Sequence, residues 1–395
     1  MSNDPIVVVS AARTPLGAFL GDFSHLTAPE LGAVAIKAAV ARAGIPAESF
    51  QELVLGCVLT AGLGQAPARQ ASIASGLPLS VGCAVVSKVC GSGMKAVMIA
   101  HDSLVAGTSD VMIAGGMESM SNAPHLLPQS RGGLRLGHGS MVDHMFLDGL
   151  EDAYFERGRL MGTFAEDCAT SYGFTREDQD TYAIESTVRA QKAITSGAFT
   201  WEIAPVAVTS KLGNSEIGND EQPLKAQIEK IRRLKPAFKK DGTVTAANSS
   251  SISDGAAALV LMRQSTADKL GAKAIATILG HATHAQEPHL FPTAPVSAMQ
   301  KMLAKVDWSV DDVDLWEINE AFAVVTMAAI RDLKLDIGKV NIHGGACALG
   351  HPIGASGARI LVTLIGALKQ TGGKRGIASL CIGGGEATSI AIQMN

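Results

Sequence analysis

Four stretches of the sequence end an apolar run with a reactive or polar side chain among small residues. They are residues 89–93 around Cys90, residues 350–352 around His351, residues 381–385 beginning with Cys381, and Asn319. A cysteine at a strand-to-helix turn lies beside the free N–H groups of a helix N-terminus, which favour its thiolate and lower its pKa. A neighbouring histidine can take the thiol proton. These residue types therefore indicate nucleophilic thiol catalysis.

Each of these side chains also has a plainer interpretation. Cys90 and Cys381 follow buried-type strands, where cysteines commonly only pack. His351 in its Gly-His-Pro turn could bond a backbone carbonyl, and Asn319 could cap a helix rather than orient a water or an oxyanion. Glu320 beside it could serve only the helix dipole. The three glycines after Cys381 instead favour a nest of N–H groups that binds an oxyanion. The residues alone leave both interpretations open.

The elements that must position these residues are strands that alternate with helices. Buried-type strands are predicted at residues 5–10, 53–58 and 111–116, and helices at residues 28–43 and 95–105. The first of these helices follows a capping box formed by Thr27 and Glu30 and stops at Gly44. Continuous apolar strands between helices predict an α/β fold with a parallel sheet covered on both faces.

An internal repeat relates the two ends of the chain. Residues 92–93 and 356–357 are Ser-Gly pairs that open a helix, and the next strand in each copy ends in glycines, at residues 115–116 and 383–385. Two copies of one plan predict two similar halves that pack together. A ligand is then expected where the strand ends of both halves converge.

The repeat divides the chain into an N-terminal half, residues 1–270, and a C-terminal half, residues 271–395. Residues 121–249 interrupt the first half, lack regular alternation and predict an inserted loop domain or lid, with one clear helix at residues 175–195. Seven basic residues there suit a phosphorylated substrate, and a solvated charged face explains them equally well. They are Lys225, Lys230, Arg232, Arg233, Lys235, Lys239 and Lys240.

Composition excludes several classes of protein. None of the apolar runs in the 395 residues reaches the ~18 residues of a membrane span. A net charge of −4 gives no electrostatic footprint for nucleic acid. The six cysteines are scattered singly with no C-x-x-C pair, which argues against a zinc site and a secreted disulfide framework. Without a signal sequence, transit peptide or peroxisomal ending, a cytoplasmic enzyme is expected.

The catalytic stretches together resemble the motif set of the thiolases, in the order of that family. Residues 89–93, 319–322, 350–352 and 381–385 carry the resemblance. It extends to residues 115–121, 243–248 and 341–357, and covers essentially the whole chain. The resemblance implies two similar βαβαβαββ halves stacked as five αβαβα layers, with an inserted loop domain. It also implies acyl-CoA substrates, a ping-pong mechanism, no cofactor or metal, and a homo-oligomer, either a dimer or, by analogy, a tetramer.

The same resemblance implies a role for each site residue. Cys90 carries the acyl group, His351 activates it, and Cys381 moves the proton of the α-carbon. His351 and a water held by Asn319 stabilise one oxyanion, and the N–H groups of Cys90 and Gly383 stabilise the other. The implied reaction is the reversible Claisen condensation of two acetyl-CoA to acetoacetyl-CoA. Expected pantetheine contacts are Ala237, Phe238, Ala246, Ser250 and Ile252, and expected acyl contacts are Leu150, Met161, Ala321 and Phe322.

Two positions depart from the pattern of short-chain thiolases. Leu160 stands where many biosynthetic members carry histidine, so one polar contact to the pantetheine arm is expected to be absent. Phe291 stands where many carry methionine, and phenylalanine there resembles thiolases that accept 2-methyl-branched substrates.

Two other functions compete with a thiolase. A decarboxylating β-ketoacyl synthase pairs its cysteine with two histidines, or with histidine and asparagine, whereas Cys381 and the Asn-Glu-Ala-Phe stretch favour a thiolase. A silent CoA-binding relative requires a missing catalytic residue, and none is missing.

Overall fold

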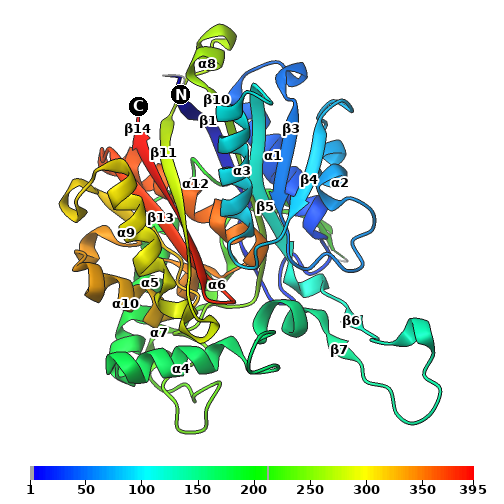
Figure 1. Ribbon diagram of the computed structural model, residues 1–395, viewed down its shortest axis with the longest axis vertical. Coiled ribbons are helices and arrows are strands. Elements are labelled where there is room, and N and C mark those ends of the chain that lie inside the picture. Colours follow the sequence, from blue (N-terminus) through cyan, green and yellow to red (C-terminus); the bar gives the residue numbers. More distant parts are fainter. Residues whose placement is uncertain (1–3, 211–212) are drawn as a thin grey trace.

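The computed structural model describes residues 4–210 and 213–395 (Figure 1). The N-terminal half consists of β1 (Ile6–Arg13), β2 (Gly17–Ala18), α1 (Ala28–Ala43), β3 (Glu52–Gly56), α2 (Pro67–Ala74), β4 (Gly82–Val86), α3 (Ser92–Ala106), β5 (Val111–Ser119), β10 (Ser253–Arg263) and α8 (Gln264–Leu270). The C-terminal half consists of β11 (Ala276–Ala285), α9 (Ala294–Val306), β12 (Leu315–Ile318), α10 (Ala323–Leu333), α11 (Ala346–Leu349), α12 (Ile353–Thr371), β13 (Arg375–Ile382) and β14 (Glu386–Met394).

The segment between β5 and β10 covers the residues for which an insertion is predicted. It contains β6 (His125–Leu126), β7 (Val142–Asp143), a π-helix (Phe146–Leu150), α4 (Met161–Tyr172), α5 (Arg176–Thr195), β8 (Val206–Ser210), β9 (Gly213–Ile217), α6 (Glu221–Lys225) and α7 (Ile228–Ile231). The predicted helix at residues 175–195 is α5, whereas α4 was not predicted. The hairpin of β6 and β7 projects from the body of the molecule (Figure 1).

The strands of the two halves repeat the same order and directions. In the first half β4, β3 and β5 run parallel, and β10 and then β1 follow antiparallel. In the second half β12 and β13 run parallel, and β14 and β11 follow antiparallel. A parallel bridge between Val340 and Trp316 of β12 takes the outer position that β4 has in the first half. Antiparallel pairing of β1 with β11 joins the halves. The repeat inferred from the sequence is therefore present in the topology.

The parallel sheet predicted from the apolar strands is present only in part. Among the described strands of the main sheet, the β3, β4, β5 group and the β12, β13 group are parallel, while β1, β10, β11 and β14 pair antiparallel. Residues 383–385 alone connect β13 to β14. A connection this short can form a hairpin but cannot cross over between parallel strands.

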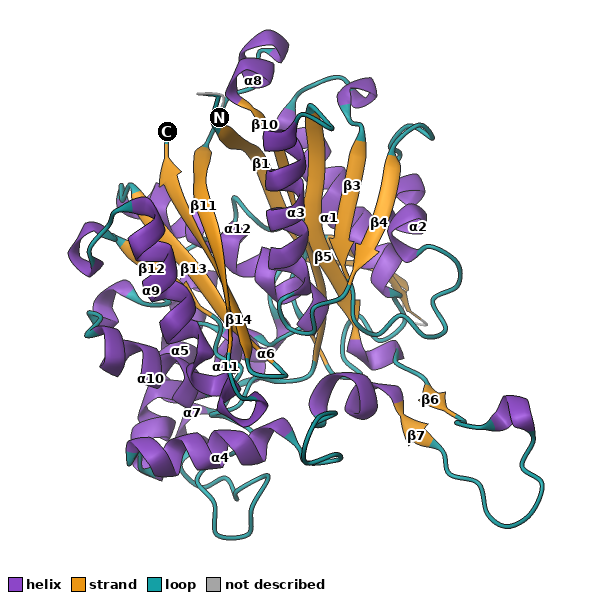
Figure 2. Ribbon diagram, in the orientation of Figure 1, coloured by secondary structure: helices purple, strands orange, loops and turns teal. Residues whose placement is uncertain are grey.

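Five layers stack around these strands. The central layer is α3 and α12, which share one core cluster with the inner faces of both sets of strands and lie between them in Figure 2. Helices α1 and α2 cover the outer face of the first half, and α9 and α10 that of the second. Residues 353–368 of α12 are buried without a break, as expected of a helix packed on all sides.

The Ser-Gly pairs of the repeat explain how the two central helices begin side by side. A Cβ atom added to Gly357 would lie 2.4 Å from the backbone nitrogen of Met94, and one added to Gly93 would lie 2.9 Å from that of Ala358. Only glycine permits this approach at both positions. Because α3 begins just after Cys90 and α12 just after His351, the close packing brings the two reactive stretches together.

Candidate active site

A cavity of about 460 Å³ lies where the reactive stretches of both halves meet. It is lined by Cys90, His351, Cys381 and Gly383, and by all ten side chains expected to contact the substrate. Those ten are Leu150, Met161, Ala237, Phe238, Ala246, Ser250, Ile252, Phe291, Ala321 and Phe322. Asn319 lies just behind this wall, with its Nδ2 atom 3.4 Å from Nε2 of His351. The structure therefore brings together the proposed catalytic residues and the ten proposed substrate contacts. Phe146, Ile353 and Ser249 also line the cavity and were not foreseen.

Cys90 occupies a tight turn between β4 and α3. Val89 before it has a φ of 45°, a left-handed conformation that a β-branched residue rarely adopts. The hydroxyl of Ser92 holds the turn closed, since it accepts from the N–H of Lys88 at 2.8 Å and donates to the carbonyl of Val89 at 2.6 Å. The helix begins at Ser92, three residues earlier than predicted, so its N-terminus lies directly beside the thiol.

The environment of Cys90 keeps its thiol protonated. Burial raises its pKa to about 11, although the N–H groups of Gly383 and of Cys90 itself point at the sulfur and lower it, and the nearby Glu118 carboxyl raises it further. The expectation that the helix N-terminus lowers the pKa of this thiol is therefore wrong, because desolvation outweighs the backbone donors. Cys90 needs a base to become a nucleophile.

His351 is suited to be that base. Its Nδ1 lies 2.5 Å from Oγ of Ser356, which itself donates to the carbonyl of Pro352 at 2.9 Å. Because the proton of the serine hydroxyl is committed to that carbonyl, Nδ1 must carry the imidazole proton and Nε2 remains free to accept one. Burial, and to a lesser extent the charge of Arg359, lowers the pKa of His351 to about 3. The imidazole is therefore neutral at rest.

Cys381 ends β13 among aromatic side chains. It belongs to the apolar cluster that contains Phe164, Phe291 and Phe322, and only 1% of its surface is exposed. Burial raises its pKa well above the ordinary value, and the nearby Cys90 raises it further. Cys381 is thus a neutral thiol at rest that becomes a strong base once it loses its proton.

Asn319 does not cap a helix. Helix α10 begins at Ala323 with Phe322 as its N-cap, and Asn319 is fully buried between β12 and that helix. Its backbone N–H donates to Ser379, its Nδ2 atom approaches His351, and its Oδ1 atom has no hydrogen-bond partner among the described residues. A buried acceptor without a protein partner beside a cavity is the arrangement that holds a water.

The interpretation that Glu320 serves only the helix dipole is wrong. Its carboxylate is fully buried and accepts from the Tyr182 hydroxyl at 2.8 Å, the Ser186 hydroxyl at 2.7 Å, Nδ2 of Asn341 at 2.8 Å and the N–H of Cys347 at 3.0 Å. It connects the insertion to the loop before His351. Nothing local in the sequence signals these contacts, because their partners are distant in the chain.

Glu118 is a second acidic residue that sequence reasoning did not assign. It is fully buried and accepts from the N–H groups of Val58 at 3.0 Å, Leu59 at 3.1 Å and Gly354 at 2.8 Å. Burial raises its pKa to about 7, against these three donors. Because Gly354 opens α12 three residues after His351, Glu118 fixes the histidine loop of one half against the other.

The basic residues of the insertion fall into two groups. Lys225 and Lys230 line a second pocket that shares Ala246 and Ser251 with the main cavity, and Lys225 also pairs with Glu221. The remaining five side chains are exposed. These are Arg232, Arg233, Lys235, Lys239 and Lys240.

Comparison with known proteins agrees with this geometry. The family models for the thiolase N-terminal and C-terminal domains match residues 6–265 and 272–394. Acetyl-CoA acetyltransferase 2 of Arabidopsis thaliana is 50% identical over 98% of this chain and 97% of its own length. Acetyl-CoA acetyltransferase of Cupriavidus necator is 47% identical over 98% and 99%.

Two solved structures share the fold along the whole chain. The Bacillus anthracis acetyl-CoA acetyltransferase superposes with a TM-score of 0.96 at 40% identity and covers 99% of each chain. The Acat5 thiolase of Ascaris suum, solved in complex with coenzyme A, superposes with a TM-score of 0.93 at 43% identity and covers 99% of this chain and 100% of its own. With its paired halves, its convergent cysteines and these matches, the chain belongs to the thiolase family.

Proposed function

We propose that this chain is an acetyl-CoA C-acetyltransferase, which joins two acetyl-CoA into acetoacetyl-CoA and CoA and also catalyses the reverse thiolysis. The observation that carries the proposal is the convergence of Cys90, His351 and Cys381 on one cavity, with the N–H of Gly383 directed at the Cys90 sulfur. The names of the relatives above point to the same reaction.

In the first half-reaction Cys90 takes the acetyl group. Nε2 of His351 accepts the thiol proton while the sulfur attacks the carbonyl carbon of acetyl-CoA. The bond between that carbon and the CoA sulfur breaks, and CoA leaves with the proton of Cys381. This yields acetyl-Cys90, a Cys381 thiolate and a His351 imidazolium. All three groups are neutral before the reaction, as their burial requires, and charge develops only during it.

In the second half-reaction the Cys381 thiolate takes a proton from the methyl carbon of a second acetyl-CoA. The resulting carbanion attacks the acetyl carbon on Cys90, the bond to the Cys90 sulfur breaks, and that sulfur recovers its proton from His351. Every group returns to its starting state, so protons and electrons balance.

Fixed hydrogen-bond donors stabilise both oxyanions on this route. The N–H groups of Cys90 and Gly383 face the acetyl oxygen, and His351 with a water on Asn319 faces the enolate oxygen. Each such donor is worth about 3 kcal/mol in comparable sites. The route therefore requires no cofactor besides the CoA substrates.

A mutant pair tests these roles. Cys90→Ala is expected to abolish acetyl-enzyme formation. Cys381→Ala is expected to acetylate more slowly, because CoA leaves without its proton donor, and to lose condensation. Cys168→Ala, another buried cysteine that does not line the cavity, is the matched control and should retain activity. Normal condensation by Cys381→Ala would disprove its role, and condensation of malonyl thioesters alone would indicate a decarboxylating synthase.

The acyl end of the cavity is expected to accept short and 2-methyl-branched chains. Phe291 and Phe322, the aromatic side chains expected at this end, both line the cavity. Leu160 also lines it and supplies no polar group to a pantetheine arm. Rates of thiolysis of acetoacetyl-CoA, 2-methylacetoacetyl-CoA and longer straight-chain 3-ketoacyl-CoAs measure this range. Turnover of acetoacetyl-CoA without any activity on the 2-methyl substrate would reject the branched-chain hypothesis.

We propose the 121–249 segment as the lid that sets this range, because Leu150, Met161, Ala237 and Phe238 of the cavity wall belong to it. The boundary of the halves near residue 270 stays a prediction, supported by the restart of the strand order at β11.

A homo-oligomer, either a dimer or a tetramer, is also proposed. Strand β4 is the outer strand of its sheet, and the hairpin of β6 and β7 carries exposed Leu127, Leu134, Leu136 and Met141. Light scattering after size exclusion tests this proposal, and a monomer would reject it.

A cytoplasmic location is proposed as well. It is supported by the six cysteines, all of which are described and unpaired. Among the described residues, no helix has the length and apolarity to cross a bilayer. Cell fractionation tests the location, and recovery of the protein from a membrane-enclosed compartment would contradict it.

A further inference from the structure

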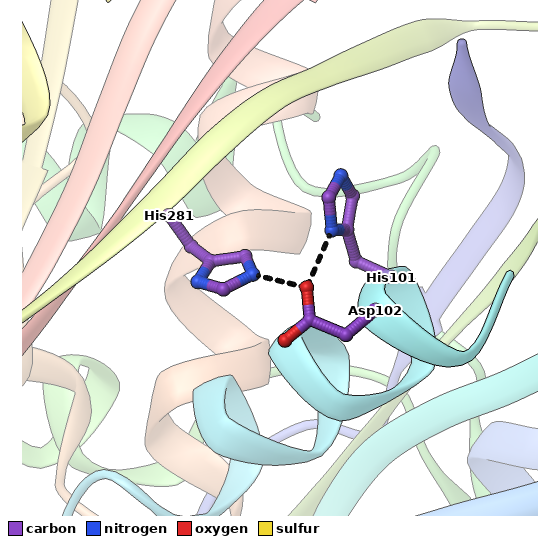
Figure 3. A group of neighbouring side chains, drawn as sticks. All are labelled: His101, Asp102 and His281. Carbon is purple, nitrogen blue, oxygen red and sulfur yellow. Dashed lines mark hydrogen bonds and ion pairs between the residues drawn. The ribbon is translucent and has the colours of Figure 1, made fainter. Parts of the chain in front are cut away.

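A cluster of three potential metal ligands lies away from the cavity, where the two halves of the molecule meet. His101 and Asp102 come from the last turns of α3, and His281 comes from β11 (Figure 3). Oδ1 of Asp102 lies 3.1 Å from Nδ1 of His101 and 2.8 Å from Nε2 of His281. The donor atoms of all three side chains lie within 4.8 Å of one another. None of these residues takes part in the proposed thiolase reaction.

The residue types of the cluster, one carboxylate and two imidazoles, are those of a ligand set. The carboxylate oxygen Oδ1 of Asp102 lies within hydrogen-bond distance of one ring nitrogen of each histidine. A metal ion needs a deprotonated carboxylate and neutral imidazoles.

The three donors are also preorganised in space. The imidazole side chains are only 15–16% exposed, and their rings meet edge to face with centroids 5.1 Å apart. The side chain of Asp102 is 58% exposed, which leaves one side of the cluster open to water. Donors around a tetrahedral zinc with bonds of 2.0–2.1 Å lie about 3.3 Å apart. The two distances to Oδ1 of Asp102, 3.1 and 2.8 Å, are close to this value, and the third is at most 4.8 Å, so side-chain rotations can place a cation among these atoms.

We propose that His101, Asp102 and His281 bind a divalent transition metal ion, most favourably Zn²⁺, with water in the fourth position. Two imidazoles and one carboxylate suit zinc better than magnesium or calcium, which prefer a complete oxygen shell. The bound ion would join α3 of the first half to β11 of the second. Since α3 begins just after Cys90, the ion would anchor the C-terminal part of the helix that follows the nucleophile.

One charge near the cluster opposes the ion. Nζ of Lys305 donates to the backbone carbonyl of His281 at 2.9 Å, so its positive charge lies beside this ligand and repels a cation. Removal of this charge should tighten metal binding, whereas loss of any ligand should weaken it. A hydrogen-bonded cluster without a metal function would respond to neither change.

Titration calorimetry with ZnCl₂ tests the proposal on the full chain after chelator treatment. The thiol of Cys90 is first blocked with iodoacetamide, so that it cannot contribute a site. We expect one Zn²⁺ per chain and a rise of the melting temperature with Zn²⁺. His281→Ala and Asp102→Asn should weaken binding by at least the ~10–100-fold that loss of an outer-shell partner costs other metal sites. His138 is an exposed histidine outside the cluster, and His138→Ala should leave the affinity for Zn²⁺ unchanged.

Two further measurements separate this site from adventitious binding. Lys305→Gln should bind Zn²⁺ several-fold more tightly than the unchanged protein. Substitution with Co²⁺ should give the visible spectrum of nitrogen and oxygen ligation without thiolate bands, and His281→Ala should abolish it. All variants should retain thiolysis, since none touches the cavity. Equal Zn²⁺ affinity in the unchanged protein, His281→Ala and Asp102→Asn would overturn the proposal, as would thiolate bands.

Discussion

Replacement of Ser356 by alanine should impair the base without touching the substrate. Its hydroxyl is the acceptor that holds the proton of His351 on Nδ1, at 2.5 Å. In Ser356→Ala that buried N–H loses its partner, at a cost of about 1–3 kcal/mol. The imidazole can then move its proton to Nε2, where it can no longer accept one from Cys90. If the whole cost appears in the barrier to acylation, the rate falls about 5–150-fold.

Rapid-quench measurement of acetyl-enzyme formation from acetyl-CoA is the direct assay. Ser356→Thr keeps a hydroxyl and should recover most of the rate, which distinguishes tautomer control from simple packing. Thr363→Ala is the matched control, because it removes another buried hydroxyl from α12, one that contacts Glu202 at 3.2 Å. Acylation by Ser356→Ala at the unchanged rate, with a normal melting temperature, would refute the assignment of His351 as a base that Ser356 orients.

Three other predictions follow from the same geometry. Because burial raises the pKa of Cys90 to about 11, inactivation by iodoacetamide should accelerate about tenfold per pH unit between pH 7 and 10. Glu320→Ala leaves the N–H of Cys347 and the hydroxyl of Ser186 without their acceptor, so urea unfolding should show a loss of at least about 3 kcal/mol, with exposed Glu229→Ala unchanged. Gly354→Ala places a Cβ 2.6 Å from the Glu118 carboxylate and should lower kcat more than it raises KM, as steady-state thiolysis can measure.

Each of these has an outcome that contradicts it. A flat pH profile of alkylation between pH 7 and 9 would mean that Cys90 rests as a thiolate. Unfolding of Glu320→Ala at the same urea concentration as Glu229→Ala would mean that its four hydrogen bonds contribute little. A Gly354→Ala enzyme with unchanged kcat would mean that the contact between Glu118 and α12 does not position His351.

Local signals in the sequence were sufficient for much of the fold. The capping box at Thr27 and the left-handed Gly44, with φ of 65°, bound α1 as predicted, and Thr175 does the same for α5. Such signals depend on residues within one or two turns of helix. The direction of a strand depends instead on pairing partners that are distant in the chain. For that reason the antiparallel pairing of β1 with β10 and β11 could not be inferred from apolar runs alone.

Site residues that lie in recognisable sequence stretches were predictable. Residues whose role depends on contacts with distant parts of the chain were not. Glu118 accepts from residues 58, 59 and 354, and Glu320 from residues 182, 186, 341 and 347, so neither partner set is visible locally. The prediction of a lowered pKa for Cys90 was wrong for the same reason. Its helix N-terminus is local, but the burial that outweighs it comes from the packing of both halves.

The most direct test of the account is mass spectrometry of the intact chain after mixing with acetyl-CoA. We predict one acetyl group per chain, mapped by peptide analysis to Cys90. The Cys381→Ala variant should accumulate this acetyl-enzyme. The unchanged enzyme should transfer the acetyl group to a second acetyl-CoA and form acetoacetyl-CoA. An acetyl group on a different residue, or acetoacetyl-CoA formed by Cys90→Ala at the normal rate, would contradict the division of labour between the two cysteines.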